Sequence, residues 1–162
     1  MLIVTSESPS VASVDTDTLA AAQELTRRLL ARGFRQPAYL SGSSRYLVNR
    51  SRLRGFFAGA EAGGVPVEGR HVFENLACRA DIVHAAHVAR AAGADCFVCG
   101  DDNICCCLLE HLADTDAAFS TRRVASLYNS VLLEAFRPAV MAVGSRSTAS
   151  TRQPAAARMA RV

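Results

Sequence analysis

The chain contains no lysine, and it has no long uninterrupted hydrophobic run. Without lysine there is no P-loop, and neither a glycine-rich phosphate loop nor a G-x-S-x-G nucleophile elbow is present. The apolar runs stay well short of the roughly eighteen residues that a membrane-spanning helix needs. The first seven residues lack the basic start and long apolar core of a secretory signal. These absences predict a cytoplasmic protein that does not enter the membrane.

The basic residues are unevenly distributed. All eighteen of them are arginine, and they outnumber the acidic residues to give a net charge of +3. Four of the arginines lie in residues 144–162, a segment without a single acid, so the rest of the chain is close to neutral. Positive charge that is confined to a tail does not create a basic surface on the folded part. We therefore do not expect the folded part to bind DNA.

Five of the six cysteines lie between Cys96 and Cys107. Because nothing indicates secretion, a disulfide scaffold is not expected. Cys96 and Cys99 have the spacing of a metal-ligand pair, but residues three apart in a strand point to opposite faces. We therefore expect buried small hydrophobic side chains, with no metal and no other cofactor. His84 and His87 lie one helical turn apart, and without a third ligand at fixed spacing we interpret them as surface residues.

Short apolar runs alternate with longer runs of helical period along the chain, which is long enough and hydrophobic enough for a sizeable core. Repeated β-α units of this length require right-handed crossovers, and they predict an α/β fold of three layers with a parallel sheet. The expected strands are residues 2–5, 11–14, 37–40, 71–73, 96–99, 124–127 and 140–143. The expected helices are residues 18–32, 46–62, 79–92 and 103–113.

Acidic side chains follow one of the expected strands, and arginines follow another. Asp101, Asp102 and Asn103 come directly after the strand at 96–99, at the edge where open α/β sheets bind ligands. One of the three is expected to cap the next helix. Arg52 lies early in the second helix, opposite in direction to its neighbours Arg50 and Arg54. Acceptors and donors at two strand ends predict a clamp for a small polar molecule.

Several stretches in order resemble the lactose-repressor (LacI/GalR) family of bacterial transcription regulators. They are Val11–Asp17, the run Leu29–Gly42, the arginine-rich Asn49–Phe56 with its R-L-x-G-F pattern, Cys96–Ile104, and Val124–Val143 with Phe136-Arg137-Pro138. The resemblance covers about residues 2–143. It implies the two-lobed fold of class I periplasmic binding proteins, with an effector in the cleft between lobes. It also implies a homodimer that binds operator DNA through an N-terminal helix-turn-helix, which this chain lacks.

The same resemblance implies a division of the chain into four parts. Residues 1–35 match the end of the first lobe, so that this lobe is incomplete, and residues 36–127 match a complete second lobe. Residues 128–143 match the segment that returns to the first lobe. Residues 144–162 form a basic tail that we expect to be mobile.

Individual roles also follow from the resemblance. Arg52 and Asp102 match the family's effector-binding arginine and aspartate, and Ser43, Tyr128 and Asn129 are further candidates for hydrogen bonds to the effector. In the family, the helix that directly follows Asp102 lies next to the dimer interface. Some of its side chains therefore face either a partner subunit or the sheet. Those side chains are Cys105, Leu108, Leu109 and Leu112.

Two departures from the family bear on the effector. Asn75-Leu76-Ala77-Cys78 stands where the family commonly has G-D-F/W-S, so an aromatic platform for a sugar ring is missing. Tyr128 and Asn129 stand where it commonly has acidic residues, and they keep hydrogen-bonding capacity without charge.

The sequence therefore predicts the effector-binding and dimerisation core of a LacI-type regulator that binds a small, sugar-like polar metabolite and is not an enzyme. The first alternative is a periplasmic-type solute-binding protein with the same fold. The second is an α/β metal-dependent enzyme that uses Asp101 and Asp102.

Overall fold

The computed structural model describes residues 3–4, 13–14, 17–116, 121–136 and 139–143. Its helices are α1 (Thr18–Leu30), α2 (Leu47–Ala62), α3 (Arg79–Ala91) and α4 (Asp102–Thr115). Its strands are β1 (Ile3–Val4), β2 (Ser13–Val14), β3 (Pro37–Leu40), β4 (Val72–Phe73), β5 (Cys96–Cys99), β6 (Val124–Ser126) and β7 (Met141–Ala142). Short 3-10 turns occupy Gly69–His71, Thr121–Arg123 and Leu133–Ala135.

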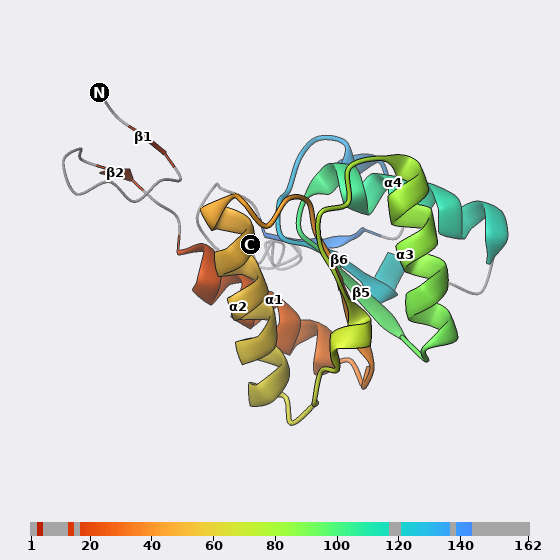
Figure 1. The fold of residues 1–162 in the computed structure, drawn as a ribbon, viewed down its shortest axis with the longest axis horizontal. Coiled ribbons are helices and arrows are strands. Elements are labelled where there is room, and N and C mark those ends of the chain that lie inside the picture. The colour runs from red at the N-terminus through yellow and green to blue at the C-terminus, as the bar shows by residue number, and fades with distance from the viewer. Residues whose placement is uncertain (1–2, 5–12, 15–16, 117–120, 137–138, 144–162) are drawn as a thin grey trace, which may run out of the picture.

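Five strands form one parallel sheet in the order β4-β3-β5-β6-β7 (Figure 1). β3 pairs along its whole length with β5, from Pro37 opposite Cys96 to Leu40 opposite Cys99. Because the strands are parallel, all their carboxyl ends lie at the same edge of the sheet. β1 and β2 form a separate parallel pair. The predicted parallel sheet is confirmed, and the strands at 37–40 and 96–99 have the predicted bounds.

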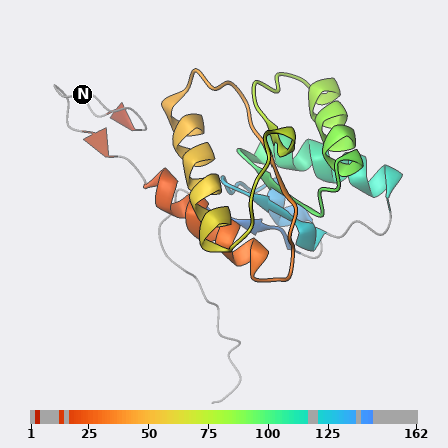
Figure 2. The same cartoon turned by 60° about the horizontal axis from the view of Figure 1, so that its bottom comes forward.

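Helices cover both faces of this sheet (Figure 1 and Figure 2). Cys96 and Val98 pack into a cluster with side chains of α1 and α2, whereas Phe97 and Cys99 pack into a cluster with α3 and α4. All four are fully buried, as in a strand that is covered on both sides. The prediction that Cys96 and Cys99 face opposite ways is confirmed.

Polar side chains mark where several helices begin. Asp17 precedes α1 and accepts a hydrogen bond from the Ala20 backbone N–H at 2.9 Å. At the start of α3, the Asp81 carboxylate accepts from the backbone N–H groups of Ala77 and Cys78. Such bonds satisfy donors that the first helical turn leaves without partners. None of the described helices combines the length and the hydrophobicity needed to cross a membrane.

α1 and α2 pack closely because α2 presents glycines to its neighbour. A Cβ atom at Gly55 would lie 2.3 Å from the Leu19 carbonyl oxygen, and one at Gly59 would lie 2.5 Å from that of Gln23. Real Cβ atoms do not approach backbone oxygens so closely, so any larger residue at these positions would push the helices apart. The glycines therefore fix how α2 lies on the sheet, including the turn that carries Arg52.

Two elements outside residues 36–127 also pack on the sheet. α1, assigned from the resemblance to a remnant of the first lobe, buries Ala22, Leu25 and Leu29 in the same cluster as Tyr39 and Phe56. β7, in the segment expected to return to the first lobe, pairs with β6 and extends the sheet. α1 thus adds to the apolar cluster on one face of the sheet, and β7 adds a strand to its edge. The basic tail lies outside the described residues.

Candidate functional site

The loops at the carboxyl edge of the sheet are tied to one another by backbone hydrogen bonds. Gly100 N–H donates to the Leu40 carbonyl at 2.7 Å, and Leu127 N–H donates to the Cys99 carbonyl at 2.9 Å. Ser41 N–H donates to the Phe73 carbonyl at 2.8 Å. The ends of four neighbouring strands are thereby held in register, and the side chains that follow them share one edge, as the topology requires.

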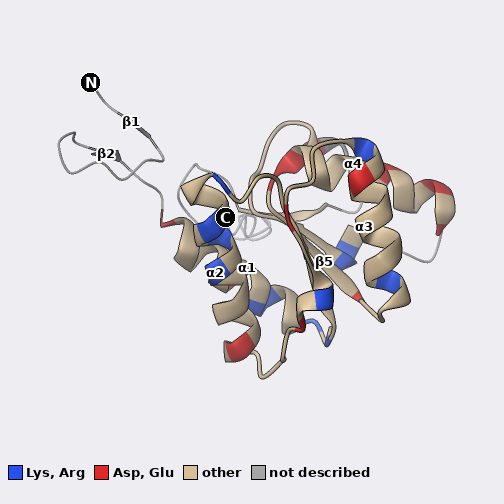
Figure 3. Cartoon of the chain, viewed as in Figure 1, with Lys and Arg blue, Asp and Glu red and all other residues tan. Residues whose placement is uncertain are grey.

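Arg52 reaches this edge from the second turn of α2 (the arginines of α2 and the acidic start of α4 can be followed in Figure 3). Its side chain is half-buried, and burial lowers the pKa of Arg52, while Tyr39, Asp101 and Tyr128 act to raise it. Asp102 acts in the same direction. Within the described part of the chain, the guanidinium forms no hydrogen bond or ion pair. A partly desolvated cation thus faces groups from β3, α4 and the loop after β6.

Arg50 and Arg54 are exposed, in agreement with the prediction that they point away from Arg52. Arg50 Nη1 donates to the backbone carbonyl oxygens of Ser44 at 3.1 Å and Arg45 at 3.0 Å, and so closes the loop before α2. Its role is local, which leaves Arg52 as the cation of this helix that points to the site.

Asp101 and Asp102 differ in what they bind. Asp101 is the cap of α4, since its Oδ1 accepts from the Ile104 N–H at 2.9 Å. The expectation that one of the three polar residues caps the helix is confirmed. Asp102 is the first residue of α4 and is half-buried, and no hydrogen bond engages its carboxylate within the described residues. Asp102 is therefore the carboxylate that remains available to a ligand, and it is also the residue that matches the family's effector-binding aspartate.

Two buried hydroxyl groups at this edge were not predicted from the sequence. Tyr39 Oη and Ser41 Oγ are buried, and neither has a hydrogen-bond partner among the described residues. Burial raises the pKa of Tyr39 to about 12, and Arg52 acts against that rise. In the sequence Tyr39 belongs to an expected apolar strand and Ser41 directly follows it, so their only signal is a polar atom in a region expected to be buried.

The remaining candidates lie at the rim of the same edge. The Ser43 carbonyl oxygen accepts from Asn49 Nδ2 at 2.9 Å, and the side chain of Ser43 is half-buried. Tyr128 and Asn129 are exposed after β6, where Ser126 Oγ donates to the Tyr128 carbonyl at 2.6 Å. These three residues follow β3 and β6 at this edge of the sheet.

Residues 75–78, where the aromatic platform is missing, stabilise the neighbouring loop. Asn75 has a positive φ of 61°, and its Oδ1 accepts from the Ser44 N–H and hydroxyl at 3.1 Å. Leu76 is partly buried against the cluster under α3 and α4. This segment therefore closes the loop after β3 and offers no exposed ring to a ligand.

The histidines and cysteines do not gather into a metal centre in the part of the chain that is described, where no group of three or more suitable ligands is found. His84 and His87 are exposed, as predicted for surface residues. His87 additionally contacts His111 of α4, with ring centroids 4.9 Å apart, which the sequence did not suggest.

The cysteines and leucines of α4 face inward. Cys105, Leu108, Leu109 and Leu112 are all buried in the cluster between α4 and the sheet. Of the two alternatives for these side chains, packing onto the sheet therefore describes them. A partner that docks on α4 would meet its half-buried and exposed positions, such as Cys107 and Glu110.

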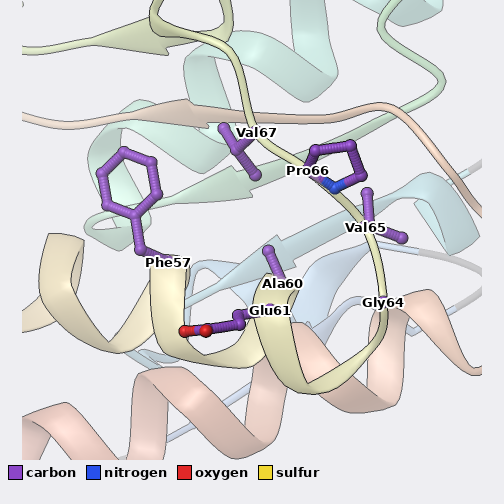
Figure 4. A pocket seen from close by; sticks show the side chains of 7 residues that line it. All are labelled: Phe57, Ala60, Glu61, Gly64, Val65, Pro66 and Val67. Carbon is purple, nitrogen blue, oxygen red and sulfur yellow. The ribbon is translucent and has the colours of Figure 1, made fainter.

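A surface pocket of about 320 Å³ lies at the opposite end of α2 from Arg52 (Figure 4). It is bordered by the end of α2 and by the loop that leads to β4. The lining residues are Phe57, Ala60, Glu61, Gly64, Val65, Pro66 and Val67. One acidic group among apolar side chains offers little for a polar ligand to bind, so the candidate site remains the carboxyl edge of the sheet.

Comparison with known proteins decides the family. Residues 2–131 match the model of the periplasmic binding proteins and sugar-binding domain of the LacI family. The chain belongs to this family. The predicted resemblance to LacI-type regulators is thus confirmed, together with the periplasmic-binding-protein-like fold class. No curated protein sequence matches the chain.

Solved structures of LacI-family members share the fold at low sequence identity. The transcription regulator CcpA of Lactococcus lactis has 21% identity and a TM-score of 0.78, over 90% of this chain and 55% of that protein. A ribose operon repressor from Burkholderia thailandensis, described as putative, has 21% identity and a TM-score of 0.73, over 88% and 54%. The regulator CelR in complex with cellobiose has 23% identity and a TM-score of 0.71, over 83% and 42%. This LacI-family chain spans about half the length of these regulators.

Proposed function

We propose that this chain is the effector-binding and dimerisation core of a cytoplasmic LacI-type transcription regulator. It binds a small polar metabolite of sugar-like size at the carboxyl edge of the sheet. The observation that carries the proposal is that Arg52 is half-buried and without an ion pair in the described residues, within electrostatic range of Asp101 and Asp102. A guanidinium donates to ligand oxygens, and a carboxylate accepts from ligand hydroxyls, so the two hold opposite sides of one small molecule.

The mechanism is linkage between ligand binding and the arrangement of lobes. A ligand that one arrangement binds better shifts the protein toward it, and a homodimer transmits that shift to a DNA-binding segment outside this chain. Arg52, Asp102 and the rim residues Ser43, Tyr128 and Asn129 supply the contacts of the second lobe. The first lobe supplies the opposite wall of the cleft.

A ligand screen tests this proposal. Small sugars, sugar acids and related metabolites are added to the purified chain, and binding is followed by the shift in melting temperature and by calorimetry. Arg52→Ala is expected to weaken any saturable binding by roughly tenfold or more, since a hydrogen bond to a charged group is lost. Arg54→Ala, an exposed neighbour on the same helix, is the matched control and should leave binding unchanged.

The alternative is a periplasmic-type solute-binding protein, because the matched family includes such proteins as well. Such a binding protein would use the same site, and it would differ from the regulator in the segment encoded before this chain. A helix-turn-helix encoded in frame upstream of Met1 supports the regulator, and a signal peptide there supports the binding protein.

A further inference from the structure

Two of the four histidines contact each other where α3 packs beside α4 on one face of the sheet (Figure 1). His87 lies in the second half of α3 and His111 in the second half of α4, and their ring centroids are 4.9 Å apart with the ring planes at 71°. His87 is exposed and His111 is half-buried, so the pair is open to solvent. The other two histidines differ, because His71 is buried beside the Ala92 carbonyl oxygen and His84 lies one turn before His87.

The separation of the two rings fits a pair of imidazoles that bind one metal ion. Transition-metal ions bind imidazole nitrogens at about 2.0–2.1 Å, which places the two ring centres roughly 4.5–5.2 Å apart at octahedral or tetrahedral angles. The observed 4.9 Å falls within this range, so neither helix has to move. The rings lie edge to face. A rotation about the Cβ–Cγ bond of the exposed His87 leaves its ring centre in place and can turn a nitrogen toward the ion.

The charges around the pair suit a divalent cation. Arg79 pairs with Glu110 at 2.7 Å, directly before the histidine of α4, and Arg90, one turn after the histidine of α3, pairs with Asp116. Both guanidinium charges are therefore offset by a carboxylate. Asp114 follows the histidine of α4 by one turn, is exposed, and forms no hydrogen bond or ion pair in the described part of the chain. The net charge beside the two imidazoles is thus negative.

We propose that His87 and His111 form a surface site for a divalent transition-metal ion, such as Zn²⁺ or Ni²⁺, that links α3 to α4. Each imidazole donates one nitrogen lone pair to the ion, and water fills the remaining positions. With two protein ligands instead of the three or four of a resident metal centre, the site exchanges its ion with solution. His111 is about 14 Å along α4 from Asp102, so this site is separate from the carboxyl edge of the sheet.

Metal titration of the full chain tests this site, and the chain is used without a histidine tag because a tag would bind the same ions. NiCl₂ is the probe, since nickel suits imidazole whereas zinc also binds the thiolates of accessible cysteines. MgCl₂ is the negative control, because Mg²⁺ prefers oxygen ligands. We expect one nickel ion per chain by calorimetry and paramagnetic broadening of the His87 and His111 ring signals in NMR. The melting temperature should rise by roughly 2–5 °C in nickel at about ten times the Kd.

Single substitutions separate this pair from the other histidines. His87→Gln and His111→Gln should each weaken nickel binding by about tenfold or more, because each removes one of two protein ligands. His84→Gln is the matched control, since His84 is exposed on the same helix one turn away, and it should leave the affinity unchanged. Without metal the three variants should melt close to the wild type, as is usual for substitutions at the surface.

The pattern across the variants decides the inference. Weaker binding in the His87 and His111 variants alone supports it. If His84→Gln weakens binding as much as His111→Gln, the ion is held by α3 alone and the inference is overturned. It is also overturned if His111→Gln binds nickel like the wild type, or if no saturable binding occurs below about 1 mM. Arg52→Ala should bind nickel normally, so failure of the metal site leaves the proposed effector site standing.

Discussion

At the scale of single residues, two adjacent aspartates have different surroundings and should respond differently to mutation. Asp101 caps α4, so Asp101→Ala should lower the free energy of unfolding by about 1 kcal/mol, as is usual for a lost cap. The Asp102 side chain forms no hydrogen bond in the described residues, so Asp102→Ala should lower the free energy of unfolding by less than about 0.5 kcal/mol. Binding of the effector should nevertheless weaken in the Asp102 variant. Urea unfolding and calorimetry measure both quantities, and a reversed order of the two stability losses would contradict the assignment.

The sequence reveals these residues unequally. Arg52 and Asp102 were predicted because their spacing from the preceding strands matches a family pattern and because charged side chains at strand ends are visible in any sequence. Tyr39 was missed because it belongs to a strand whose sequence predicts burial, and Ser41 was missed because it directly follows that strand. Their importance depends on which neighbours lack hydrogen bonds, and a linear pattern does not contain that information.

At the scale of elements, the contact between α1 and α2 depends on glycine. Gly59→Ala places a Cβ atom against the Gln23 carbonyl oxygen and Thr26 Cβ, and should destabilise the protein by about 1–3 kcal/mol. Gly69→Ala is the matched control, since its Cβ meets nothing within 4 Å and its backbone is not in the left-handed region. It should be neutral or slightly stabilising. Thermal unfolding of the two variants is the measurement, and equal stability would show that α2 can shift without cost.

The contribution of the first turn of α3 to stability should depend on pH through the Asp81 carboxylate. Hydrogen bonds from the backbone N–H groups of Ala77 and Cys78 hold the pKa of Asp81 below its usual value near 3.8. A lowered folded-state pKa means that the stabilisation is complete above the unfolded pKa and is lost as the pH falls through the folded one. Asp81→Asn should therefore remove part of the loss of stability as the pH falls below about 4. Urea unfolding across this range checks it, and an unchanged pH profile would contradict the role of the carboxylate.

The helices and strands themselves were predicted well, because caps, glycines and apolar periods are local signals. α4 begins one residue earlier than expected and ends two residues later, since Asp101 rather than Asp102 is the cap. The side on which α1 packs was not predicted. Its apolar face was clear from the sequence, but an apolar face does not say which sheet it covers.

At the scale of the whole molecule, α1 should be indispensable to the fold. A chain that starts at residue 17 retains the packing of α1 on Tyr39 and Phe56, whereas one that starts at residue 36 exposes both side chains. The longer variant should unfold cooperatively, and the shorter one should lose cooperativity or aggregate. Circular dichroism during heating distinguishes them. Cooperative unfolding of the shorter chain would show that the sheet folds without α1.

The central claim is that one ligand lies between Arg52 and Asp102. The most direct measurement is a crystal structure of the chain with the metabolite that emerges from the screen. The account predicts a single ligand at the carboxyl edge of the sheet, with oxygens about 2.7–3.0 Å from both the Arg52 guanidinium and the Asp102 carboxylate. A ligand in the pocket beside Phe57 and Pro66, or at the edge with only one of the two residues, would contradict it.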